Sequence, residues 1–391
     1  MSESGNKDIL AGGRRVALVV GVAGLAICAW SALTDTATFF QAYLLAFAYV
    51  AAVTLGSLSI LLIQHTVTGR WGLAIRRHLE AATRLLPLLA VLFIPVVLGL
   101  HHLYGWADPA VVAGSAVLQR KVAYLNVPGF IGRAVLYFAV WLTLAYILNR
   151  WSRRQDTITD VNLPIRFRQL AAPGLVAYAL TVTFASFDWL MSLEPEWYST
   201  MFGVQFFAGG ALAAMSVTIL VLSRTAKQGP LAAILKPETI GDLGNLTLAF
   251  TLFWTYVTFS QFLIIWSGNL PEEVPWYWDR VNGGWQYVGI SLGLLQFIVP
   301  FLCLLPRSNR RDLRRLARLA AFILVMRFAD LLWIVGPTFS PGLFRFPLVN
   351  VGAMAMLGGL WFWLYAGQLG RLPLLPLKDA RLTAKEDSRH G

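Results

Sequence analysis

Ten apolar runs of about 20 residues each are the feature that most restricts how this chain can fold. Only 13% of the residues are charged, about half of the roughly 25% usual in soluble domains. Lipid can solvate apolar surface that a soluble domain of this size could not bury. We therefore expect an all-α integral membrane protein with ten transmembrane helices, spanning residues 16–32, 40–64, 85–104, 128–148, 170–191, 201–222, 243–266, 285–305, 319–335 and 349–369.

The distribution of basic residues predicts the orientation of these spans. When the connections are assigned alternately to two sides, 26 of the 32 Lys and Arg residues fall on the side of the N-terminus. The exceptions are Arg120, Lys121, Arg280 and Arg345 on the other side, with Arg133 and Arg327 inside spans. The positive-inside rule then places both termini in the cytoplasm. The net charge of +12 thus reflects topology, and we expect no nucleic-acid partner.

This assignment divides the chain into three parts. Residues 1–15 form a cytoplasmic segment, 16–370 a membrane domain and 371–391 a cytoplasmic tail. The first apolar run is long for a signal peptide and lacks a clear cleavage site, so we interpret it as a retained span. The stretch 65–84, which contains Arg76 and Arg77, is expected to be a cytoplasmic loop.

Metal-binding motifs are absent from the sequence. Cys28 and Cys303 lie in separate apolar runs, with no CxxC or CxxCH pattern. His101 and His102 are adjacent, so on a helix they point about 100° apart and cannot both face one haem. We expect no cofactor held covalently or by metal ligands.

Charged side chains inside spans are costly and mark functional sites or buried pairs. Arg327 and Asp330 are three residues apart in the ninth span, so they share one helix face. One interpretation is a buried ion pair that fixes helix packing. The other is a proton relay, in which Asp330 exchanges a proton and Arg327 tunes its affinity.

A second group of ionisable residues lies near the outer ends of spans. Asp188 is either an interfacial carboxylate or, with Glu194, an outer proton exit. Arg133 either extends to the interface or pairs with Asp188 on a neighbouring helix. His101 and His102 are interfacial residues or hydrogen-bond partners of a quinol. Any quinol site in this chain is expected near His101, His102, Arg133 and Asp188.

The seventh span carries a partly polar face. Thr255, Tyr256, Ser260 and Gln261 lie close together in the sequence. They predict either hydrogen bonds between helices or a row of side chains and water that conducts protons, to which Tyr256 and Gln261 would contribute.

The connections on the outer side are rich in aromatic residues. Those at 107–127 and 267–284 either belong to the interfacial aromatic belt or dock a partner outside the membrane. The sequence contains two similar strings, Phe184-Ala-Ser-Phe187 and Phe259-Ser-Gln-Phe262. Each is followed by an acidic string that contains Trp and Tyr. Two related bundles would produce such a repeat, and so would chance.

Several longer strings resemble one known family. They are Lys121-Val-Ala-Tyr-Leu-Asn126 with Arg133 and Ser152-Arg-Arg-Gln-Asp156, Phe184-Ala-Ser-Phe-Asp-Trp-Leu-Met-Ser-Leu-Glu-Pro-Glu-Trp-Tyr-Ser199, Phe259-Ser-Gln-Phe262, Trp266, Asn269-Leu-Pro-Glu-Glu273, Gly283-Gly-Trp285, and Arg327, Asp330, Trp333 and Pro337. Together they resemble the ActF subunits of bacterial alternative complex III, a quinol:cytochrome c oxidoreductase. ActF subunits belong to the NrfD/PsrC-like membrane proteins. The resemblance extends from about residue 85 to residue 337.

The resemblance implies a fold of two four-helix bundles plus two further helices, in the bacterial inner membrane. It implies a structural subunit that conducts protons or interacts with menaquinol or ubiquinol. The implied partners are an ActC-like sister subunit, an iron–sulfur subunit, haem c subunits, a terminal cytochrome c oxidase and membrane lipid. Many family members have His where this chain has Arg327, which weakens the transfer of a titrating role to that position. Asp188 and Asp330 keep the family pattern.

Two alternative functions remain open. One is the membrane anchor of another NrfD-type reductase, such as polysulfide reductase. The other is a stand-alone secondary transporter, which helices interrupted at matching positions of both halves would favour.

Overall fold

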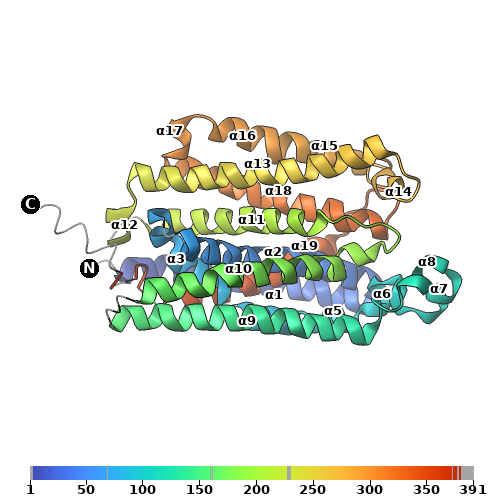
Figure 1. Ribbon diagram of the computed structural model, residues 1–391, viewed down its shortest axis with the longest axis horizontal. Coiled ribbons are helices and arrows are strands. Elements are labelled where there is room, and N and C mark those ends of the chain that lie inside the picture. The colour runs from blue at the N-terminus through green and yellow to red at the C-terminus, as the bar shows by residue number, and fades with distance from the viewer. Residues whose placement is uncertain are drawn as a thin grey trace, which may run out of the picture.

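The computed structural model describes residues 3–67, 69–158, 160, 162–226, 230–371, 373–376 and 378–379, with the backbone alone at 3–9, 70 and 230. Within these ranges ten helical segments are long and apolar enough to cross a membrane, so the predicted fold class and number of spans are confirmed. The segments run side by side (Figure 1). We call the end where α1 begins and α19 ends the terminal end, and the opposite end, with α7, α8 and α14, the distal end.

The spans consist of α1 (Glu3–Thr34), α2 (Thr36–Val67), α3 (Arg70–Thr83) with α4 (Leu86–Leu92) and α5 (Ile94–Leu98), α9 (Val127–Thr157), α10 (Leu163–Trp189), α11 (Phe202–Thr225), α13 (Pro237–Gly268), α15 (Trp285–Ser291) with the π-helix η3 (Leu292–Ile298) and α16 (Val299–Leu304), α18 (Leu313–Phe339) and α19 (Leu348–Leu369). The short elements are α6 (Leu100–Leu103), η1 (Gly105–Ala107), α7 (Pro109–Gly114), α8 (Ala116–Lys121), η2 (Met191–Leu193), α12 (Pro230–Ile234), α14 (Val274–Trp278) and α17 (Arg307–Arg310).

Local sequence explains where helices start and break. Asn126 caps α9 by accepting a hydrogen bond from the Gly129 N–H, and Asp312 caps α18 in the same manner. Pro87 and Pro95 lie in the first turns of α4 and α5, where a missing N–H costs little, and they divide the third span. Pro300 follows η3 and begins α16.

The helices form two four-helix bundles joined by α2 and α11. In the first bundle α2 packs against α3 and α10, and α10 packs against α9. In the second bundle α11 packs against α13 and α18, which both contact η3. A Cβ atom at Gly56 of α2 would overlap the backbone of Gly210 in α11, so these two helices cross at a distance that only glycine permits.

The two remaining helices, α1 and α19, pack on each other and on α2. Gly24 of α1 meets the backbone at Gly352 and Met356 of α19, again where a Cβ atom would overlap. The arrangement of two four-helix bundles plus two further helices therefore agrees with the predicted fold.

The expected cytoplasmic loop at 65–84 is wrong. This stretch contains α3, which packs against α2, α9, α11, α13 and α19. Arg76, Arg77 and Glu80 are each only 1% exposed. The third membrane segment accordingly starts at Trp71 and ends at Leu98, instead of covering 85–104. Burial is tolerated because both arginines pair with Glu80 and, in addition, Arg77 pairs with Asp156 of α9 and Arg76 with Asp379.

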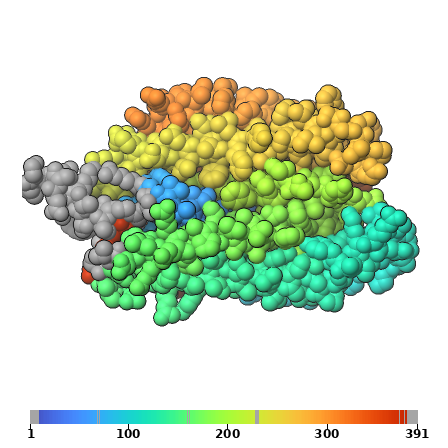
Figure 2. Space-filling model, viewed as in Figure 1, coloured from blue at the N-terminus to red at the C-terminus, as the bar shows by residue number. Residues whose placement is uncertain are grey.

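The two similar strings of the sequence do not occupy equivalent positions in the two bundles. Phe184 and Phe187 end the last helix of the first bundle, whereas Phe259 and Phe262 lie in α13, the second helix of its bundle. The strings meet at the distal end, where the rings of Trp197 and Trp276 stack with centroids 4.3 Å apart. Beside them α7 and α8 project from the body of the protein (Figure 2).

Candidate functional site

The candidate site is centred on Arg327 and Asp330, halfway along α18. Nη1 of Arg327 lies 2.8 Å from Oδ2 of Asp330, and the two side chains are 2% and 1% exposed. The i,i+3 spacing places both on the face that packs into the second bundle, as the sequence predicts. An ion pair is the form in which such charges can be buried at mid-span.

Two neighbouring helices complete the surroundings of Arg327. The Gln296 amide is placed so that both its polar atoms are hydrogen-bonded. Its oxygen accepts from Nη1 of Arg327 at 2.8 Å, and its nitrogen donates to the Met326 carbonyl at 2.8 Å. Gln296 belongs to the π-helix η3, a type of distortion frequent at functional sites. Gly209 of α11 leaves room for the guanidinium, which also lies 5.7 Å from the ring centroid of Trp254.

Asp330 is less well satisfied than Arg327. Its two carboxylate oxygens make no hydrogen bond of good geometry to any described residue, despite the close approach of Nη1. A buried oxygen without an aligned donor has high free energy, and accepting a proton is one way to lower it. Asp330 thus has the surroundings of either a structural ion-pair partner or a proton carrier.

The same face of α18 continues to a polar cluster at the distal end. Arg280 donates to the Ile334 carbonyl at 2.6 Å and to Oε1 of Glu194 at 2.8 Å, and Thr338 donates to the same Glu194 oxygen. Asp330 and Thr338 are eight residues apart, a rise of about 12 Å along the helix. Burial lowers the pKa of Arg280, and Glu194 acts in the opposite direction.

The partners of Glu194 change one prediction. Glu194 contacts Arg280 and Thr338 of the second bundle, so it does not form a proton exit together with Asp188. Sequence reasoning placed Arg280 in an outer connection and missed that it is 1% exposed.

Asp188 instead pairs with Arg133 in the first bundle. Nε and Nη2 of Arg133 donate to the two Asp188 oxygens at 2.9 and 3.0 Å, a bidentate geometry. The Tyr137 hydroxyl donates to Asp188 at 2.8 Å, and the Tyr124 ring lies 3.9 Å from the guanidinium carbon. Of the two alternatives for Arg133, the structure therefore shows the pair.

The two outer histidines lie apart from this pair. His101 and His102 are exposed at the distal end, and His102 stacks on Phe40 with ring centroids 5.4 Å apart. This position suits residues of the membrane interface.

The polar residues of the seventh span, α13, do not form one continuous row. Tyr256 is 67% exposed and points away from the bundle, because it lies on the opposite side of α13 from the buried Trp254 and Val257. Gln261 is buried, accepts from Ser199 at 2.9 Å and lies 3.5 Å from the Tyr277 hydroxyl. Of the two candidates, Gln261 alone faces the interior, where it links the distal connections.

A buried charge cluster at the terminal end was missed altogether. Glu80 of α3 accepts from Arg76 at 2.8 Å, from Arg77 at 2.9 Å and from the Ser152 hydroxyl of α9. Arg76 also donates to Gln155, at 2.8 Å. The signal was available, because Glu80 is the single acid among the arginines of 70–84, at i,i+4 and i,i+3 spacing from two of them.

The described residues contain no group of three or more His, Cys, Asp or Glu side chains that could hold a metal ion. The fold and the four clusters of paired charges define a multi-pass helical membrane protein with ionisable groups inside its bundles. Comparison with protein-family models and with curated proteins finds no match. The family therefore remains a prediction from the sequence strings.

Proposed function

We propose that this chain is the ActF-like membrane subunit of a bacterial quinol:cytochrome c oxidoreductase of the alternative complex III type. The observation that carries the proposal is the combination of two four-helix bundles with the outlying pair α1 and α19, the architecture that the sequence resemblance implies. The subunit lies in the inner membrane with the terminal end in the cytoplasm, because the connections at that end hold most of the basic residues.

In this orientation the distal end faces the outside and meets the electron-transfer subunits. Large apolar side chains are exposed in its connections, with Tyr198, Leu270 and Trp278 between 50% and 64% exposed. Apolar and aromatic side chains of this kind are typical of protein interfaces. They support docking of an iron–sulfur subunit and haem c subunits, which would supply redox centres whose ligand motifs do not occur in this sequence.

The Arg327–Asp330 pair supports a role in proton movement. A relay needs a carboxylate that is reachable through polar groups, and the face of α18 carries Asp330, the Ile334 carbonyl bound by Arg280, and Thr338 bound to Glu194. An ActC-like sister subunit would supply the main quinol site. Menaquinol or ubiquinol that contacts this chain would lie near Arg133 and Asp188.

The position of the helix interruptions bears on the transporter alternative. In the first bundle the interrupted span is the second helix, α3 to α5, whereas in the second bundle it is the third, α15 to α16. Transporters with internal repeats place such breaks at corresponding positions. This mismatch favours a subunit of a complex over a stand-alone transporter.

Purification of the tagged chain from its native membrane tests the proposal. We expect it to elute with chains that show haem c absorption and an iron–sulfur signal, and with quinol:cytochrome c reductase activity. Elution with iron–sulfur chains but without haem c would favour another NrfD-type reductase. Elution of the chain alone, with substrate-dependent transport in vesicles, would refute the proposal.

A further inference from the structure

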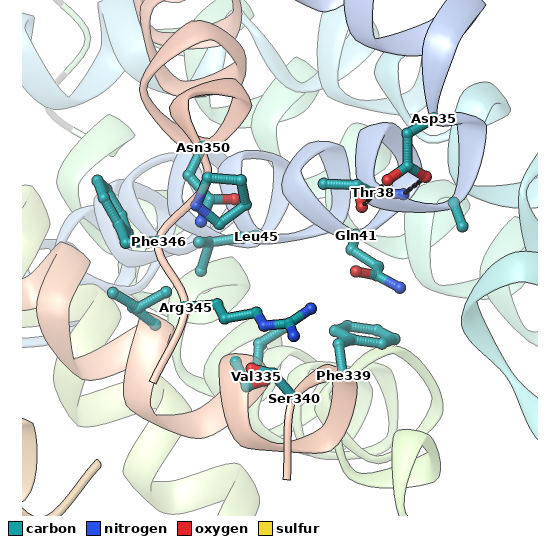
Figure 3. Close-up of a pocket in the computed structure, with 14 residues that line it drawn as sticks. Asp35, Thr38, Gln41, Leu45, Val335, Phe339, Ser340, Arg345, Phe346 and Asn350 are labelled. Carbon is teal, nitrogen blue, oxygen red and sulfur yellow. Dashed lines mark hydrogen bonds between the residues drawn. The ribbon is translucent and has the colours of Figure 1, made fainter. Parts of the chain in front are cut away.

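A cavity of about 680 Å³ lies at the distal end between α2, α18 and α19, and none of the charged residues of the clusters described above lines it. Its walls come from the first turns of α2, the last turns of α18, the connection 340–347 and the first turn of α19 (Figure 3). A volume of this size is typical of sites for small molecules.

The cavity holds two opposite charges at its outer rim. Asp35 accepts from the N–H and the hydroxyl of Thr38 at 3.1 and 2.7 Å, and these bonds lower the pKa of the carboxyl, so it is negative at neutral pH. The guanidinium of Arg345 extends into the cavity from the other side (Figure 3). No ion pair among the described residues joins Asp35 to Arg345, so each charge is available to a ligand.

Two amide side chains also line the cavity. Asn350, in the first turn of α19, is only 8% exposed, and its side chain makes no hydrogen bond to another described residue. Gln41, one turn below Thr38, likewise lines the cavity (Figure 3). An amide offers both a donor and an acceptor, so these two side chains can hydrogen-bond to a polar ligand in the cavity.

The inner part of the cavity is apolar. Leu45, Leu332 and Val335 line it toward the middle of the membrane. Asp35 and Leu45 are ten residues apart, so the polar rim and the apolar floor are separated by about 15 Å along α2. This gradient matches an amphiphile that stands upright in one leaflet, with its headgroup at the rim.

We propose that this cavity binds a phospholipid with a primary-amine, zwitterionic headgroup. Arg345 binds the phosphate, assisted by the positive N-terminal end of α19. Asp35 binds the ammonium, whose N–H groups can donate to its free lone pairs. Gln41 and Asn350 bind the ester region, and the acyl chains lie on Leu45, Leu332 and Val335. An anionic headgroup would leave Asp35 facing a phosphate, and a neutral quinol would leave both charges unused.

Native mass spectrometry of the full protein, titrated with defined lipids, tests this. We expect phosphatidylethanolamine to bind about 10-fold more tightly than phosphatidylcholine or phosphatidylglycerol, because the choline nitrogen has no N–H and the glycerol headgroup has no cation. Arg345→Gln should weaken binding of phosphatidylethanolamine by about 10-fold, a loss of one charge-assisted contact. Arg120→Gln, on the exposed surface of α8, is the control and should change nothing.

Asp35→Asn tests the selectivity separately. Asn caps a helix as well as Asp, so α2 should start normally, while the preference for phosphatidylethanolamine over phosphatidylcholine should fall to about one. Equal binding of the three lipids to the unchanged protein would overturn the proposal. So would unchanged selectivity in Asp35→Asn, or displacement of the bound lipid by an equimolar quinone analogue, which would assign the cavity to quinone.

Discussion

Gly209 of α11 lies directly under the guanidinium of Arg327, at a position where any Cβ atom would overlap that group. The guanidinium cannot move away freely, because Asp330 and Gln296 hold it from two other sides. A glycine in a buried helix thus makes the room that a mid-membrane arginine needs.

Gly209→Ala should therefore destabilise the protein by about 1–3 kcal/mol, the usual cost of overpacking a core. Thermal unfolding in detergent measures the effect. Gly132→Ala in α9 is the matched control, because a Cβ there meets nothing and the change should be neutral or slightly stabilising. Equal melting temperatures for the two variants would show that Arg327 relaxes without cost.

Asp330→Asn and the double change Arg327→Met with Asp330→Asn separate architecture from proton transfer. If the pair is structural, the single change strands a buried arginine, costs about 3–5 kcal/mol and reduces the amount of assembled protein, and the double change restores it. If Asp330 carries protons, the single variant assembles but proton release coupled to quinol oxidation falls. Full proton release in an assembled double mutant would refute the relay.

The Arg133–Asp188 pair should be more important for stability than the hydroxyl that also binds it. Asp188→Asn removes the charged, bidentate partner of a half-buried arginine and should cost about 3–5 kcal/mol, whereas Tyr137→Phe removes one hydrogen bond to a charged group and should cost about 1.5–3 kcal/mol. A photoactivatable quinone analogue should label this region if the chain binds quinol. Labelling confined to a sister subunit would remove quinol binding from this chain.

Reporter fusions test the orientation of the spans. A fusion after Arg311, in the connection that precedes α18, should be active as a cytoplasmic reporter, and an insertion near Glu273 should be active as an external one. A reporter inserted within α3, at His78, should instead disrupt folding, because this helix is buried on all sides. The reverse activities at Arg311 and Glu273 would refute the ten-span topology.

The N-cap of α18 should depend on pH. The Arg315 and Arg314 N–H groups donate to Asp312 and lower the pKa of its carboxyl. A lowered pKa means that the cap stabilises the folded state above the ordinary pKa of about 3.9 and that this contribution is lost as the pH falls through the lower folded value. The protection of the Arg314 and Arg315 amides from hydrogen exchange, expressed as the exchange rate of an unstructured peptide at the same pH divided by the observed rate, should be high at pH 7 and lower at pH 3 in the unchanged protein. In Asp312→Asn, where residue 312 does not titrate, the protection of these two amides should not fall between pH 7 and pH 3.

The resemblance implied the two-bundle architecture. The sequence by itself determined the number of spans and the shared helix face of Arg327 and Asp330. These follow from local rules, because apolar run length counts helices and i,i+3 spacing fixes which side chains share a face. It also raised the Arg133–Asp188 pair as one of two alternatives.

Tertiary structure alone decided which charges are buried and which partners they have. Arg76, Arg77 and Glu80 look like part of a cytoplasmic loop because charged residues are usually in water, yet they pair with one another inside the bundle and with Ser152 and Asp156 of α9. Glu194 lies six residues from Asp188 but binds Arg280, and Tyr256 points outward although Gln261 of the same helix is buried. A helix offers its side chains to every direction, and only the placement of its neighbours determines which of them meet a partner and which meet lipid.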